Sequence, residues 1–288
     1  MKYINNISEI SDQYQYYIFD IWGVIHDGNE AYQGAIKAIK ELKSQNKKIC
    51  FLSNAPRRST KVAKVLEKFG ITPDLYDFAM SSGEATYSFL EKNQEDNYSS
   101  YGQKYFYIGP QKDVDLLDGL NYQITENAEE ADFALTTGFN NDQSTIEEKL
   151  PQINAAIKNN LKMICVNPDM IVVRQNGTQM LCAGRIAAEF KKLGGEVTYF
   201  GKPHEAAYTT TLNLFGKNID RKEILAIGDS LETDITGANN LGIDNLLLTG
   251  GILSNQVNNN LDSAQLEVEI KKICDINNTY SSYVTKFL

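Results

Sequence analysis

The sequence predicts an α/β fold, in which a second α/β domain is inserted into a doubly wound, Rossmann-like parallel sheet. Two observations predict the sheet: strand, helix and strand patterns follow one another near the amino terminus, and they return near the other end of the chain. Alternating elements of this kind favour parallel strands that are covered by helices on both faces. A separate strand-and-helix series between them predicts the insertion. We therefore expect a core domain of residues 1–81 and 196–288 and an inserted domain of residues 82–195.

The first unit opens with the short apolar run Tyr16–Phe19, which ends at Asp20 and is typical of a buried strand with a polar end. Apolar residues then recur at helical spacing over residues 34–42. Lys48–Leu52 is the second predicted strand, and it leads into the turn-like sequence Ser53-Asn54-Ala55-Pro56.

The second unit lies near the other end of the chain. Glu223–Ile227 predicts a buried strand, which leads into Gly228-Asp229-Ser230. A helix is expected over about residues 233–241 and a further strand over residues 245–248.

The segment between these units contains three strand-like runs, at residues 105–108, 133–136 and 163–166, with amphipathic helices expected between them. The polar stretch Glu91–Gly102 is predicted to be a mobile loop near the first crossing between the domains. Residues 192–195, which end in two glycines, predict a helix end near the second crossing.

Composition excludes several classes of protein. The formal net charge of -9 and the scattered lysines and arginines argue against a nucleic-acid surface. No apolar run approaches the roughly 18 residues of a membrane span, and the first residues lack the pattern of a signal peptide, so a cytoplasmic location is expected. The four cysteines form no C-x-x-C pair, which predicts buried free thiols rather than a zinc or redox site.

Four short sequences place polar groups at predicted strand ends or on adjacent loops. They are Asp20-Ile21-Trp22-Gly23-Val24, Ser53-Asn54, Gly201-Lys202-Pro203-His204 and Gly228–Asp234. Each alone is as well explained by a turn, a helix cap or a solvent-facing lysine. Ligands of open α/β sheets gather outside the carboxyl ends of the strands, so Asp20, Ser53 and Asp229 are expected to meet in space.

In this order the four sequences resemble the haloacid dehalogenase (HAD) superfamily. More narrowly, the chain resembles the class IIA phosphatases of that superfamily, a group that includes NagD-type nucleotidases, 4-nitrophenylphosphatases and pyridoxal phosphatase. The resemblance spans nearly the whole chain. It includes a large insert between the second and third sequences, within which Asn167-Pro168-Asp169, Arg174 and Gly177 resemble the loop of a C2-type cap.

The resemblance implies a Mg²⁺-dependent phosphatase that hydrolyses a small phosphorylated metabolite. Asp20 would be the nucleophile that forms an aspartyl-phosphate. Mg²⁺ would be bound by the carboxylates of Asp20 and Asp229 and by the backbone carbonyl of Trp22, while Asp234 would orient water at the ion.

The same resemblance implies how the substrate is bound. Lys202, the Ser53 hydroxyl and the backbone amides at Asn54 and Ala55 would contact the phosphoryl oxygens. In the cap loop, Asp169 and Arg174 are open to two interpretations, selection of the leaving group or local stabilisation of the loop. A homodimer is compatible with the resemblance, but no feature of the sequence demands one.

One residue departs from the family pattern D-x-D-G-V. The second aspartate, which exchanges protons with the leaving group and with water, is Trp22 in this chain, and an indole N–H is a donor only. Hydrolysis is then expected to be slow, to use Asp27 or His26 instead, or to be limited to substrates with good leaving groups. The alternative is a noncatalytic protein that retains the metal site and binds a phosphorylated ligand.

Overall fold

The computed structural model describes residues 1–288 except 96–100, 175 and 259–260. Its larger sheet has seven parallel strands in the order β1-β14-β13-β12-β2-β3-β4. The strands β2, β3 and β12 are therefore neighbours at the centre of the sheet. The sheet consists of β1 (Lys2–Tyr3), β2 (Tyr16–Phe19), β3 (Lys48–Ser53), β4 (Phe78–Ser81), β12 (Ile224–Gly228), β13 (Asp244–Leu248) and β14 (Tyr283–Thr285).

Helices cover both faces of this sheet. Alternate residues of one strand point to opposite faces, so Tyr17 and Phe19 of β2 pack in the cluster that contains α1 and α2, while Ile18 packs with α6 and α7. On the second face, α8 packs against Leu247 of β13. The core helices are α1 (Gln33–Ser44), α2 (Ser59–Lys68), α6 (Glu205–Phe215), α7 (Thr236–Leu241) and α8 (Ser263–Ile276).

A second, five-stranded parallel sheet has the order β11-β8-β7-β5-β6. One face packs against α4 (Leu150–Lys158) and α5 (Ala183–Lys192), and the other packs against α3 (Ser82–Glu95) and the short helix η4 (Gln111–Leu117). The strands are β5 (Lys104–Ile108), β6 (Gln123–Thr125), β7 (Phe133–Thr136), β8 (Lys162–Cys165) and β11 (Val197–Tyr199).

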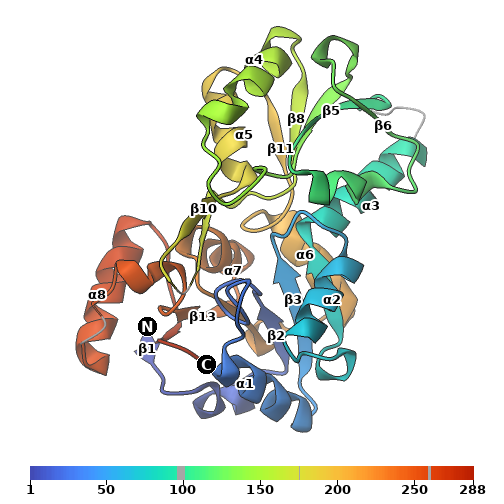
Figure 1. Ribbon diagram of the computed structural model, residues 1–288. Helices are drawn as coiled ribbons and strands as arrows, with labels where there is room; N and C mark the ends of the chain where they lie inside the picture. Colours follow the sequence, from blue (N-terminus) through green and yellow to red (C-terminus); the bar gives the residue numbers. More distant parts are fainter. Residues whose placement is uncertain (96–100, 175, 259–260) are drawn as a thin grey trace.

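A short antiparallel hairpin lies between the two lobes in Figure 1, in which the five-stranded sheet lies above the seven-stranded one. The hairpin consists of β9 (Ile171–Val173) and β10 (Gln179–Leu181), and it follows β8 in the chain. This hairpin contacts the core, where Trp22 donates a hydrogen bond to Val173. The second lobe therefore contacts the core through a segment that the sequence periodicity did not predict.

The predicted fold is confirmed: a doubly wound parallel α/β sheet with an additional α/β sheet segment. Two details of the prediction are wrong. Strand β11 pairs with β8 of the second sheet, so the chain returns to the core after Tyr199 and not at residue 196. The helix α3 continues to Glu95, so the first part of the predicted Glu91–Gly102 loop is helical, and residues 96–100 lie outside the described residues. Among the described residues, no helix has the length and apolar character needed to cross a membrane.

Candidate active site

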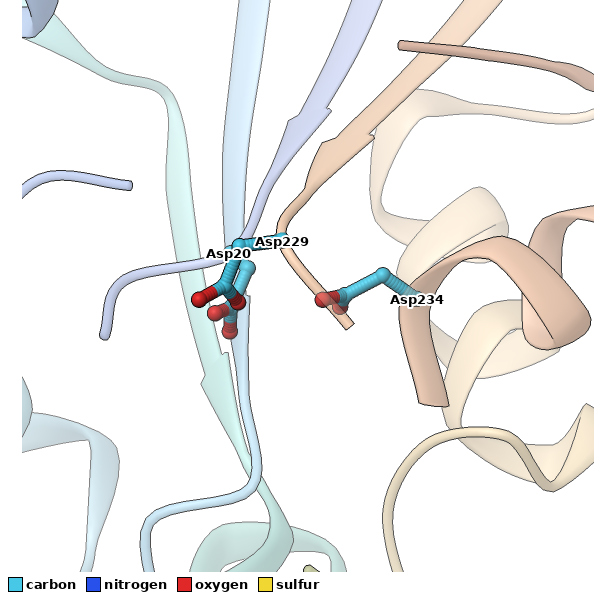
Figure 2. Close-up of side chains that lie close together, drawn as sticks. All are labelled: Asp20, Asp229 and Asp234. Atoms are coloured by element: carbon cyan, nitrogen blue, oxygen red, sulfur yellow. The ribbon is translucent and has the colours of Figure 1, made fainter. Parts of the chain in front are cut away.

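Three aspartates meet at the carboxyl edge of the larger sheet. Asp20 follows β2, Asp229 follows the adjacent strand β12, and Asp234 lies in the helical turn Leu231–Ile235 that leads into α7. One carboxylate oxygen from each lies within 4.8 Å of the others, and all three side chains are buried. Figure 2 shows Asp20 and Asp229 side by side, with Asp234 turned toward them from the helical side. The sheet therefore brings together residues that are more than two hundred positions apart, as the sequence predicted.

Lys202 joins two of these carboxylates. Its Nζ donates hydrogen bonds to Asp20 Oδ1 at 2.5 Å and to Asp234 Oδ1 at 2.7 Å. The lysine lies on the loop between β11 and α6, and its backbone N–H donates to Asn54 Oδ1 at 2.7 Å. The loop after β3 thus holds the lysine backbone, while Asp20 and Asp234 hold its ammonium group.

Burial makes the charge of this cluster unfavourable. It raises the pKa of Asp20 to about 7, although Lys202 opposes the shift, and it raises the pKa of Asp229 well above its ordinary value, with Asp20 and Asp234 adding to the effect. Burial alone would lower the pKa of Lys202, but Asp20 and Asp234 raise it above its ordinary value. One ammonium group cannot neutralise three carboxylates, so the cluster lacks positive charge.

The donor set fits a hard divalent cation. Mg²⁺ prefers oxygen ligands and is commonly held by one or two carboxylates, which is the chemistry that Asp20 and Asp229 offer. Asp229 is further positioned by Ile252, whose backbone N–H donates to Asp229 Oδ2 at 2.7 Å. Gly23 and Gly251 leave room for this carboxylate, since a Cβ on either would fall 2.0 Å from Asp229 Oδ2. Gly23 also has φ +81°, which glycine adopts without strain.

A cavity of about 290 Å³ opens above the cluster. It is lined by residues of the core loops, by the hairpin and by the loop after β8. Every site residue that the sequence predicted lies on its wall: Asp20, Trp22, Ser53, Asn54, Ala55, Asp169, Arg174, Lys202, Asp229 and Asp234. The structure therefore assembles these residues, which come from both sheets, around one space.

The Asn54 side chain connects both sheets at this cavity. Its Nδ2 donates to Asp169 Oδ1 at 2.7 Å and to the Lys202 carbonyl at 3.1 Å. The Ser53 hydroxyl accepts a hydrogen bond from the Ala55 N–H at 3.2 Å. For Asn54, only the backbone amide was assigned a role from the sequence, because no local pattern pointed to this side-chain bridge.

The hairpin contacts the loop that follows β2 through Trp22 and Arg174. Trp22 Nε1 donates to the Val173 carbonyl at 2.9 Å, and its ring lies over Gly28, where a Cβ would fall 2.5 Å from the indole. Arg174 donates to Asn29 Oδ1 at 2.6 Å and to Asp142 Oδ2 at 2.7 Å. The indole N–H is therefore hydrogen-bonded to the hairpin, and it does not serve as a proton donor in the cavity.

Replacing Trp22 with phenylalanine tests this contact. The variant keeps an aromatic ring but leaves the Val173 carbonyl without its donor, so we expect the free energy of unfolding to fall by about 0.5–1.5 kcal/mol in urea denaturation. Tyr280→Phe is the control, because that side chain is 57% exposed and its hydroxyl makes no hydrogen bond within the described chain. Equal stabilities of both variants would contradict a contribution from this hydrogen bond.

The two substitutes considered for the missing acid do not line the cavity. Asp27 Oδ1 accepts hydrogen bonds from the backbone N–H groups of Asn29 and Glu30, both at 2.8 Å, which is the role of a turn-forming acid. His26 Nδ1 accepts from the Gly28 N–H at 2.9 Å, and the ring stacks on Phe69 at 4.3 Å between centroids. Burial lowers the pKa of His26 to about 4, so the imidazole is neutral near pH 7.

Fold and site together define a class of protein: a doubly wound parallel α/β core with a buried carboxylate cluster at its carboxyl edge and a second α/β sheet above it. Residues 17–123 match the family model described as haloacid dehalogenase-like hydrolase, and residues 199–269 match a second model described as HAD-hydrolase-like. Sugar-phosphatase AraL of Bacillus subtilis is 30% identical over 236 residues, which cover 81% of this chain and 82% of that protein. The chain belongs to the haloacid dehalogenase-like hydrolase family.

Solved structures agree with this assignment. A haloacid dehalogenase-like hydrolase from Brucella suis superimposes with a TM-score of 0.83 at 27% identity, covering 99% of each chain. A p-nitrophenyl phosphatase from Archaeoglobus fulgidus has the same fold, with a TM-score of 0.71 at 22% identity over 96% of this chain and 97% of that one. The predicted class of enzyme, a phosphoric monoester hydrolase of the HAD type, is confirmed by the family match and by the similarity to the sugar-phosphatase.

Proposed function

We propose that the protein is a Mg²⁺-dependent class IIA phosphatase that hydrolyses a small phosphorylated metabolite through an aspartyl-phosphate on Asp20. The observation that carries the proposal is the buried cluster in which Lys202 contacts both Asp20 and Asp234 while Asp229 lies beside them. The similarity to a sugar-phosphatase supports the substrate class. Residues 1–81 and 196–288 would form the core and residues 82–195 a C2-type cap, with the return crossing shifted past β11.

In this proposal each residue of the cluster has a separate role. Asp20 attacks phosphorus in line with the bond to the leaving group. Asp20, Asp229 and the Trp22 backbone carbonyl would hold Mg²⁺, which would supply positive charge next to the phosphoryl group. Lys202, the Ser53 hydroxyl and the amides of Asn54 and Ala55 contact the nonbridging oxygens, where charge must be balanced as the ester bond breaks. Asp234 fixes the Lys202 ammonium and orients water.

Of the two interpretations of Asp169 and Arg174, the proposal adopts selection of the leaving group, because both residues line the cavity from the second domain. Arg174 also contacts Asn29 and Asp142, so its guanidinium is positioned by both lobes. A cytoplasmic location and a homodimer remain predictions from the sequence.

A panel of phosphorylated metabolites with Mg²⁺ tests the proposal, with sugar phosphates, nucleoside monophosphates and 4-nitrophenyl phosphate as members. Release of inorganic phosphate from at least one of them is the expected result. The alternative is a noncatalytic or very slow protein that binds a phosphorylated ligand, which is favoured by the tryptophan at position 22. Binding of a panel member in calorimetry without any phosphate release would support that alternative.

Metal binding is tested separately from turnover. Because Mg²⁺ would offset the repulsion among the three carboxylates, we expect it to raise the melting temperature of the wild type, and EDTA to remove both this stabilisation and the activity. Asp229→Asn should lose most of the Mg²⁺-dependent shift. Glu129→Gln, on an exposed side chain of the second domain, should keep all of it. If Mg²⁺ raised the melting temperature of Asp229→Asn as much as that of the wild type, the ion would bind elsewhere.

A further inference from the structure

The cavity contains no conventional proton donor at position 22, since the Trp22 N–H is bonded to Val173. Six carboxylates lie on the described part of its wall: Asp20, Asp113, Asp142, Asp169, Asp229 and Asp234. Three of these form the central cluster. Asp113 is paired with Arg57 at 2.7 Å and Asp142 with Arg174 at 2.7 Å, so each already has a guanidinium partner. Of the six carboxylates, only Asp169 belongs neither to the central cluster nor to an ion pair with an arginine.

Asp169 is placed by contacts with the core. Its Oδ1 accepts a hydrogen bond from Asn54 Nδ2 at 2.7 Å, and Asn54 Oδ1 in turn accepts from the Lys202 N–H. Among the described residues, no cation lies within ion-pair distance of Asp169, and Oδ2 accepts no hydrogen bond. One oxygen is therefore anchored beside the lysine that contacts the nucleophile, and the other is available to a substrate.

The backbone around Asp169 is fixed as well. Its N–H donates to Asn167 Oδ1 at 2.9 Å, and its carbonyl accepts from the Gly184 N–H at 3.1 Å. Gly184 allows α5 to start close to this loop, since a Cβ there would fall 2.1 Å from the Pro168 carbonyl oxygen. The carboxyl is thus carried by a loop that packs on the second domain and not by a free side chain on the surface.

The environment suits proton exchange near neutral pH. Burial raises the pKa of the Asp169 carboxyl to about 6, against the lowering effects of Lys202 and Asn54 and with added repulsion from Asp234 and Glu232. The neighbouring thiols of Cys165 and Cys182 stay neutral, because burial raises their pKa values. A general acid works best when its pKa lies near the working pH.

We propose that Asp169, on the second domain, is the general acid and base that position 22 lacks; the inference rests on the proposed phosphatase function. As Asp20 attacks phosphorus and the ester P–O bond breaks, the protonated Asp169 carboxyl gives its proton to the leaving-group oxygen, and an alcohol departs. Asp169, now a carboxylate, then takes a proton from water as the water oxygen attacks the aspartyl-phosphate. Inorganic phosphate leaves, the Asp20 carboxylate is restored, and Asp169 is protonated again.

Asp169→Asn separates proton transfer from structure. An asparagine oxygen can still accept the hydrogen bond from Asn54, so the contact between the domains is kept while the titratable proton is lost. With an alkyl phosphate from the panel, kcat should fall by about 10²–10⁴-fold. Asp115→Asn is the matched control, because Asp115 also links the second domain to the core, through Lys61, but lies outside the cavity. It should retain wild-type rates.

4-Nitrophenyl phosphate gives the readout that a merely structural role would not produce. Its leaving group departs without a proton, so Asp169→Asn should release about one equivalent of nitrophenolate per site in a fast burst, followed by slow turnover, because water attack then lacks its base. The wild-type kcat/KM for the alkyl phosphate should fall as pH rises through about 6, where the acid loses its proton, and the variant should lack this limb.

The outcomes are distinct. An active wild type with unimpaired Asp169→Asn turnover of the alkyl phosphate would overturn the inference and leave the proposed function standing. A burst slowed as much as alkyl phosphate turnover would also overturn it, because that pattern indicates a misplaced active site. A wild type that hydrolyses neither substrate contradicts the proposed function and the inference with it.

Discussion

Replacing Asp20 with asparagine is expected to abolish phosphatase turnover, with kcat reduced by at least about 10⁴-fold, since removal of a covalent nucleophile costs that much or more in other hydrolases. The reason is local. Asp20 contacts Lys202, lies beside Asp229 and directly follows the central strand β2. An amide there cannot form the aspartyl-phosphate. The measurement is phosphate release by the purified variant on the best substrate of the panel.

The variant is expected to fold, because asparagine has nearly the same size and Lys202 keeps its second partner, Asp234. Circular dichroism and the melting temperature check this point. Asp244→Asn provides a comparison at the end of the core sheet away from the cavity, where Asp244 accepts hydrogen bonds from Tyr14 and Ser282, and its kcat should stay near the wild-type value. Turnover by Asp20→Asn within tenfold of the wild type would exclude Asp20 as the nucleophile.

Replacing Lys202 with methionine is expected to have the second large effect, on stability as well as on activity. The Lys202 side chain is 96% buried and its ammonium group is hydrogen-bonded to Asp20 and Asp234, so its removal leaves these carboxylates without their cation. Breaking a buried ion pair in this way costs about 3–5 kcal/mol. We expect a decrease of that size in the free energy of unfolding, measured by urea denaturation without Mg²⁺, and loss of phosphate release.

Lys158→Met is the control for the lysine variant, because that side chain is 78% exposed and should change the stability by less than about 0.5 kcal/mol. If repulsion among carboxylates causes the destabilisation, Mg²⁺ should raise the melting temperature of Lys202→Met more than that of the wild type. A variant as stable as the wild type would show that the buried lysine does not balance the cluster.

Much of the core and of the site was predictable because each piece has a local signature. Apolar runs ending in a polar residue identify β2, β3 and β12, and parallel strands bring their carboxyl ends to one edge. The meeting of Asp20, Ser53 and Asp229 follows from that geometry without further information. Lys202 was placed from its sequence and its resemblance, and the structure brings its ammonium to Asp20.

Other features had no local signature. The hairpin β9–β10 has strands of only three residues, too short for a periodic pattern, and β11 is equally short. Asp27 and His26 lie within five residues of Trp22 in sequence, yet neither lines the cavity. Sequence proximity was therefore a poor guide to which acid could replace the missing one.

The sequence by itself determined the alternation of strands and helices, the polar strand ends and hence the central cluster around Asp20. Only the tertiary structure decided what covers that cluster. The Asn54–Asp169 hydrogen bond joins residues 115 positions apart, and the Trp22–Val173 hydrogen bond joins residues 151 positions apart. Such contacts depend on how the second sheet packs over the first, and this packing is set by the fit of whole surfaces and not by any short run of residues.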